Sequence, residues 1–138
     1  MEFIKVEEFL EQDTRVQKVL LDWFNKNISR YDLVQDGNEI MLYKDYLERG
    51  YIENDSYPLF TEGQLREFIK DKESDKHEII CHIFHNFNIK DGTTTVYKGY
   101  YQPWGYDCES LGKYDGDNMI RIYWNIAIAK EEINNDRV

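Results

Sequence analysis

The middle of the chain reads Tyr57-Pro58-Leu59-Phe60-Thr61-Glu62-Gly63-Gln64-Leu65-Arg66-Glu67-Phe68-Ile69-Lys70. Pro58 disfavours helical backbone at the residue before it, so the stretch begins as an extended segment. Thr61 and Gln64 have the spacing of a capping box, in which side chains satisfy two backbone N–H groups at a helix start. Three apolar residues then recur at helical spacing: Leu65, Phe68 and Ile69. The stretch predicts a strand-to-helix corner, with a short helix over residues 62–71.

Two helices are predicted before this corner, the first over residues 5–12 and the second starting at Asp13-Thr14. Either of these two residues can cap a helix with its side-chain oxygen. In the second helix five apolar residues recur at intervals of three and four: Val16, Val19, Leu20, Trp23 and Phe24. After the Asp36-Gly37 turn signal, the apolar run Ile40–Tyr43 predicts a strand.

A hairpin is predicted after a charged link at residues 71–76. Residues 77–89 predict a strand, Asp91-Gly92 is a strong hairpin turn signal, and residues 94–101 form the predicted returning strand. Residues 102–117 show no periodicity and contain several breakers, so we expect a long loop, which in a compact domain is usually functional or mobile. Residues 118–132 fit both a strand and a helix, and Asp117 as a cap with two alanines favours the helix.

Together these elements predict one α+β domain over residues 1–138. It has a small antiparallel sheet, with an N-terminal helical pair, a central short helix and a C-terminal helix packed on it. The hydrophobic share of 41% and charged share of 32% are typical of a globular chain. A domain of this length buries roughly 68% of its unfolded surface, so no disulfide or metal is needed to keep it folded.

The charge balance is strongly acidic, with 27 acidic and 17 basic residues and a formal net charge of −10. Such a field repels nucleic-acid phosphate and anionic membranes, so we expect no direct binding to nucleic acid and none to membranes. It suits a basic protein partner, although many cytoplasmic proteins are simply acidic. The chain starts with no basic, apolar leader and contains no run of about 20 apolar residues. We therefore expect a cytoplasmic protein.

Histidines and cysteines invite a metal or nucleophile site. His77, His82 and His85 match no zinc spacing, and on one strand only His77 and His85 would share a face, too far apart for a common ion. Cys81 has no acid placed to orient a neighbouring histidine, so we expect a buried structural cysteine. We predict no catalytic residue, no metal and no cofactor.

Aromatic residues crowd the predicted hairpin and loop, and acids are interleaved with them. Tyrosine and tryptophan give large contact area at low entropic cost and are favoured at binding hot spots. The alternative is that half or more of these rings cap the core. The candidate binding residues are Tyr97, Tyr100, Tyr101, Trp104, Tyr106, Asp107, Glu109, Tyr114 and Asp115.

Four stretches of the chain carry a resemblance to known proteins: Phe9–Val19 with Asp22-Trp23, Tyr43–Leu47, Pro58–Ile69 and the closing stretch Tyr123–Glu132. In these stretches the chain resembles small phage and prophage proteins of Gram-positive bacteria. The resemblance covers the first half of the chain well, and it is weakest over residues 77–117. It implies a phage or prophage origin and a C-terminal helix. It carries over no catalytic or binding residue.

These observations favour a non-enzymatic, phage-encoded binding protein. We expect an acidic inhibitor of a host defence or nucleic-acid-handling protein, of the anti-CRISPR or anti-restriction type, acting in the host cytoplasm. Its partner would be a host protein with a basic nucleic-acid-binding surface. Two alternatives stay open: a small-molecule binder that sequesters a nucleotide signal, and a phage accessory enzyme.

Overall fold

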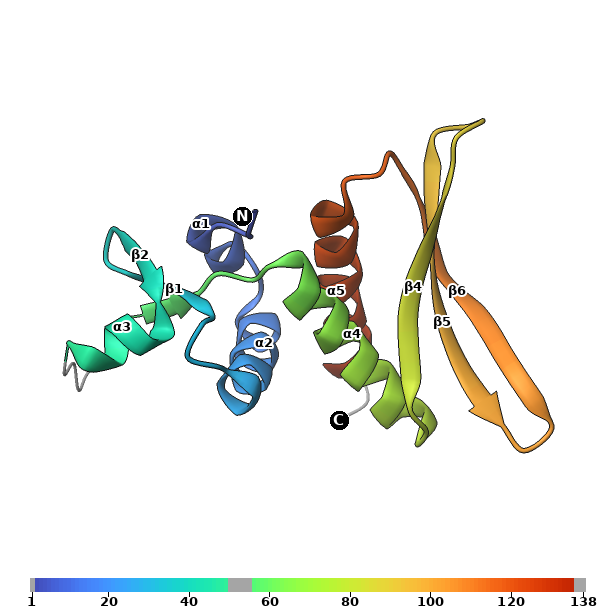
Figure 1. Cartoon of the computed structure of the whole chain (residues 1–138), viewed down its shortest axis with the longest axis horizontal. Coiled ribbons are helices and arrows are strands. Elements are labelled where there is room, and N and C mark those ends of the chain that lie inside the picture. The colour runs from blue at the N-terminus through green and yellow to red at the C-terminus, as the bar shows by residue number, and fades with distance from the viewer. Residues whose placement is uncertain (1, 50–55, 136–138) are drawn as a thin grey trace. The chain divides into compact units, whose positions relative to one another are not determined.

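The computed structural model describes residues 2–49 and 56–135, and their fold is α+β as predicted (Figure 1). These residues form five helices and two antiparallel sheets of three strands each. The chain divides into two compact units, residues 1–61 with 131–138 and residues 62–130, which we call the first and second units. The prediction of a single domain stays a prediction.

The first unit contains α1 (Val6–Leu10), α2 (Thr14–Asn27), β1 (Leu33–Asp36), β2 (Glu39–Leu42), α3 (Tyr43–Glu48) and β3 (Ser56–Pro58). Asp13 caps α2, because its carboxylate accepts a hydrogen bond of 2.8 Å from the Arg15 backbone N–H. The strands lie in the order β2-β1-β3. The ring of Phe60 packs against Phe9 and Phe24 at centroid distances of 6.1 and 5.6 Å. The residues after Pro58 therefore belong to the core of this unit.

The second unit begins with α4 (Glu62–His77), which starts directly after Thr61 as the capping signal predicts. The helix is six residues longer than expected, because the charged residues 71–76 continue it instead of forming a link. Four of its side chains are buried, and one of them is an acid: Leu65, Phe68, Ile69 and the acid Glu73. The prediction that His77 opens a strand is wrong, since His77 is the last residue of α4.

The sheet of this unit has the order β4-β5-β6 and consists of β4 (Cys81–Asn88), β5 (Thr93–Gln102) and β6 (Gly105–Asp115). The Asp91-Gly92 turn between β4 and β5 is as predicted, with Gly92 at a φ of +71°. The predicted loop at 102–117 is wrong, because most of it is β6 and only Pro103-Trp104 separates that strand from β5. Leu111 is an extra residue in β6: Val96 lies opposite Gly112, and Tyr97 lies opposite Ser110.

The last helix, α5 (Met119–Asn135), confirms the choice of helix over strand for the C-terminal segment. Ile120, Tyr123, Trp124 and Ala127 are buried at helical spacing. The Tyr123 hydroxyl lies 3.1 Å from the His85 ring of β4, so α5 packs on the sheet. Figure 1 shows α4 and α5 on the same side of the three strands.

Candidate functional site

The β4–β6 sheet has two chemically different faces. Side chains alternate between the faces of a strand, and residues opposite one another in a pair share a face. Cys81, Ile83, Val96, Lys98, Tyr100, Asp107 and Glu109 share the face that meets the helices, which we call the inner face. The outer face carries His82, Phe84, Tyr97, Gly99, Tyr101, Tyr106, Cys108 and Ser110. Each face offers a candidate site.

Five rings form a continuous row across the three strands of the outer face. Neighbouring ring centroids are 5.3 Å apart for Tyr97 and Phe84, 5.4 Å for Phe84 and His82, 5.7 Å for His82 and Tyr106, and 5.1 Å for Tyr106 and Tyr101. The Tyr106 hydroxyl also lies 2.8 Å from Nε2 of His82. We call these five side chains the aromatic row.

Gly99 makes room for this arrangement. It lies opposite both His82 and Cys108 in the middle strand. A Cβ atom at this position would lie 2.8 Å from the His82 ring and closer still to the Tyr106 hydroxyl, which is nearer than side chains pack. The Tyr106 ring therefore lies across the backbone of Gly99 to reach His82.

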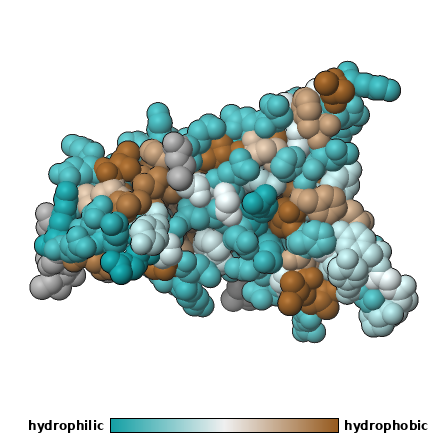
Figure 2. Space-filling model, in the orientation of Figure 1, coloured by the Kyte–Doolittle hydropathy of each residue, from teal (hydrophilic) through white to brown (hydrophobic). Residues whose placement is uncertain are grey.

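The aromatic row is open to solvent at the β5–β6 end of the sheet. The exposed fraction is 76% for Tyr101, 47% for Tyr106 and 82% for Trp104, which lies in the adjoining turn. In Figure 2 this end of the hairpin is pale, of intermediate hydropathy, whereas brown hydrophobic atoms mark the tip of the β4–β5 hairpin. From the β5–β6 turn to Ser110, the outer face carries no acid, lysine or arginine. The surface is aromatic and uncharged.

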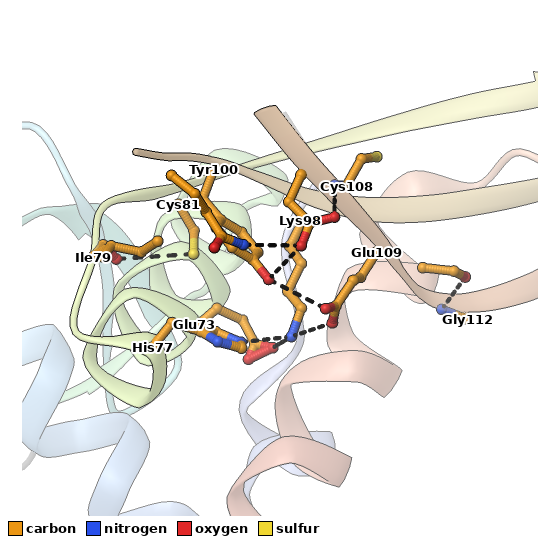
Figure 3. Close-up of polar contacts among 12 residues, drawn as sticks. Glu73, His77, Ile79, Cys81, Lys98, Tyr100, Cys108, Glu109 and Gly112 are labelled. Atoms are coloured by element: carbon orange, nitrogen blue, oxygen red, sulfur yellow. Dashed lines mark hydrogen bonds and ion pairs between the residues drawn. The ribbon is translucent and has the colours of Figure 1, made fainter. Parts of the chain in front are cut away.

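A buried lysine organises the inner face. The Lys98 ammonium lies 3.2 Å from a carboxylate oxygen of Glu73, 3.3 Å from one of Glu109 and 2.7 Å from Nε2 of His77 (Figure 3). The side chains of Lys98 and Glu73 are only 6% and 2% exposed. Because Glu73 and His77 belong to α4 and Glu109 to β6, these contacts join the helix to the far strand through β5.

Tyr100 extends this network along the inner face. Its hydroxyl is a hydrogen-bond donor to carboxylate oxygens of Asp107, at 3.2 Å, and Glu109, at 3.1 Å. Its ring stacks on that of His77. Burial and the two carboxylates raise the pKa of Tyr100 to about 12. Hydrogen bonding to Lys98 lowers the pKa of Glu109 below its ordinary value. The network is paired and ionic, which is the form in which charges are tolerated inside proteins.

The structure separates the candidate residues that the sequence grouped together. Tyr97, Tyr101 and Tyr106 lie on the outer face, with Trp104 beside them in the turn. Tyr100, Asp107, Glu109 and Tyr114 lie on the inner face, and Asp115 ends β6. Asp107 and Glu109 are bound to inner-face partners, so they are not interleaved with the exposed rings. The aromatic part and the acidic part of the candidate set therefore face opposite ways.

Six residues that sequence reasoning did not select as binding residues belong to these sites: His82, Phe84 and Gly99 in the outer face, and Glu73, His77 and Lys98 in the inner face. The alternation of His82 and Phe84 with inward residues was visible in the sequence. Their alignment with Tyr97 across β5 depends on the hairpin pairing. Lys98 and Glu73 are 25 positions apart, and no local pattern connects them.

The histidines and cysteines have separate environments. Nitrogen atoms of His77, His82 and His85 lie close to Lys98, Tyr106 and Tyr123 respectively. Among the described residues, no three His, Cys, Asp or Glu side chains are grouped to hold a metal ion. Cys81 is buried as predicted, and burial raises the pKa of its thiol. Cys108 is exposed on the outer face.

In residues 2–49 and 56–135, no helix is long and apolar enough to cross a membrane. Comparison of the chain with protein-family models, with curated proteins and with solved structures found no match.

Proposed function

We propose that this chain is a non-enzymatic binding protein that contacts a host protein through the outer face of its β4–β6 sheet. The observation that carries the proposal is the aromatic row, together with Trp104 at its open end. Exposed aromatic side chains held in place by their neighbours lose little entropy on binding and are frequent hot spots. Gly99 supports this proposal, because any side chain there would collide with the Tyr106 and His82 rings of the row.

The charge of the chain defines the class of partner. Residues 62–130 carry eleven acidic and nine basic side chains, a net charge of −2, whereas the rest carry sixteen and eight, a net charge of −8. The uncharged outer face supplies contact area, while the acidic remainder attracts a basic surface at long range. We propose a host defence or nucleic-acid-handling protein as the partner, and an anti-CRISPR or anti-restriction role. The resemblance to phage proteins supports this role, because a phage-encoded protein acts inside a host cell.

A capture experiment tests the proposal. The tagged chain is incubated with lysate of a Gram-positive host, and bound proteins are identified by mass spectrometry. We expect a basic nucleic-acid-binding protein, released when salt screens the attraction between charges. The Tyr101→Ala and Trp104→Ala variants should each weaken capture about tenfold or more, as hot-spot truncations do.

Tyr31→Ala is the matched control, because Tyr31 is a similarly exposed tyrosine, 70% accessible, that lies in the first unit. It should leave capture unchanged. If Tyr101→Ala and Trp104→Ala capture the same partner as the parent chain, the outer face is not the contact surface. If all three variants fail equally, aromatic exposure in general, rather than this face, governs binding.

A second candidate function rests on a pocket of about 510 Å³ in the first unit. Its lining includes four aromatic side chains: Phe24, Tyr43, Tyr46 and Tyr57. The volume is within the range of small-ligand pockets, and an aromatic lining suits a planar base. A chain that sequesters a nucleotide signal should gain thermal stability from micromolar nucleotide. A thermal-shift screen that finds no stabilising nucleotide excludes this function.

A further inference from the structure

Strand β6 is a long, open edge of the second unit's sheet. It spans eleven residues, Gly105–Asp115, and most of them are exposed. Among the described residues, β5 is its only pairing partner. An edge strand presents a row of backbone N–H and C=O groups that can pair with a further extended chain. Two N–H groups of β6 donate to exposed side chains, Cys108 to Asp107 at 3.0 Å and Gly112 to Ser110 at 3.1 Å, and an added strand would replace these local contacts.

The two edges of this sheet differ in charge. Strand β4, the opposite edge, carries no acidic or basic residue apart from its two histidines. Strand β6 carries three carboxylates, Asp107, Glu109 and Asp115, and one cation, Lys113. Of the two edges, β6 is therefore the one that favours a basic segment.

Two of these carboxylates occupy alternate positions on the inner face. Asp107 lies opposite Tyr100, and Glu109 lies opposite Lys98. The Glu109 side chain is 50% exposed although it pairs with Lys98, so part of its carboxylate still faces solvent. A carboxylate has about four acceptor positions and can therefore take a second cation.

We propose that β6 accepts an extended basic segment of the partner protein as a fourth strand. The inference rests on the proposed function, because it names how that partner binds. Lysine or arginine side chains at every second position of the segment would meet Asp107 and Glu109, at the short distances of cross-strand neighbours. The intervening side chains would lie beside Tyr106 and Ser110 on the outer face. The added strand would therefore also contact the aromatic row at Tyr106.

A synthetic peptide tests this without knowledge of the partner. The probe alternates Lys and Thr and is long enough to span β6. We expect it to bind, and to slow hydrogen exchange at those β6 amides that point away from β5, as measured by NMR. The control peptide has the same side chains and charge, with every backbone nitrogen methylated, so that it cannot donate to a strand.

A pair of variants tests the charge requirement. Asp107→Asn should weaken binding of the Lys-Thr peptide about two- to fivefold, the usual worth of one cross-strand charge pair. Glu67→Gln is the matched control, because it removes one exposed carboxylate from α4, where its partner is Lys70. It should leave the affinity unchanged.

The proposal is overturned if the methylated peptide binds as tightly as the probe, or if the probe binds without protecting β6 amides. Either result would mean attraction between charges without strand pairing. Failure of the proposed function is a separate result: the peptide would then protect β6 normally, while the chain captures no host protein through Tyr101 and Trp104.

Discussion

Replacing Lys98 by methionine should cost about 3–5 kcal/mol of unfolding free energy, the usual loss when one partner of a buried ion pair is removed. Methionine keeps most of the apolar stem but leaves the Glu73 carboxylate, in a side chain only 2% exposed, without this ammonium. It also removes the group that connects His77 of α4 to Glu109 of β6. The loss should therefore exceed that of any exposed ion pair in the chain.

Urea unfolding followed by circular dichroism measures this loss. With an m-value of about 2 kcal/mol/M, the midpoint should fall by about 2 M. Lys113→Met is the matched control, since Lys113 pairs at 3.3 Å with Asp91 in an exposed position. Its cost should stay below about 1 kcal/mol, as for other surface salt bridges.

A double variant identifies the interaction. Lys98→Met combined with Glu73→Leu removes both buried charges, so it should be more stable than the sum of the two single losses predicts. A loss below about 1 kcal/mol in Lys98→Met would refute the reasoning. Strict additivity in the double variant would refute it equally, because the two charges would then be independent.

Three further predictions concern the same sheet. Gly99→Ala should destabilise the fold by about 1–3 kcal/mol, because the added methyl group would crowd the Tyr106 ring. Gly63→Ala is the control: the space around Gly63 in α4 is open, so this change should be neutral or stabilising in thermal unfolding. The pKa of Tyr100 is raised to about 12 in the folded state, so its contribution to stability should be present below pH 10 and decline as the pH rises from 10 toward 12. In an absorbance titration of the tyrosines, the step near pH 12 should be missing from the Tyr100→Phe variant. The pKa of Glu109 is lowered on folding, so its contribution should be present above pH 4.5 and be lost as the pH falls through the folded pKa; Glu109→Gln should flatten the acid side of the stability profile.

Local signals in the sequence identified most of the elements. The spacing of apolar residues in α2, the turn at Asp91-Gly92 and the corner after Pro58 are decided by nearby residues, and all three are confirmed. The charged residues 71–76 do not show a helical pattern in the sequence, because only one of them, Glu73, is buried. Its burial depends on Lys98, which lies in a different element.

Strand β6 could not be recognised by hydropathy. A half-buried strand normally alternates apolar and polar residues, but Asp107 and Glu109 occupy its inward positions, and Tyr106 and Cys108 its outward ones. Both inward acids have a partner on the opposite strand, Tyr100 for Asp107 and Lys98 for Glu109. The composition of the segment therefore identifies the candidate aromatic residues. Their division between two faces can be known only from the pairing of β5 with β6.

The opposite character of the two faces restricts insertions and deletions in the β5–β6 hairpin. Moving β6 by one position along β5 would exchange its faces, sending Asp107 and Glu109 outward and Tyr106 toward Lys98. Such a register slip would remove Glu109 from Lys98 and break the aromatic row at once. Leu111 already absorbs one extra residue beyond this region, so the part of the strand that carries both sites keeps its alignment. Length variation between Gly105 and Ser110 should therefore be tolerated only in steps of two residues.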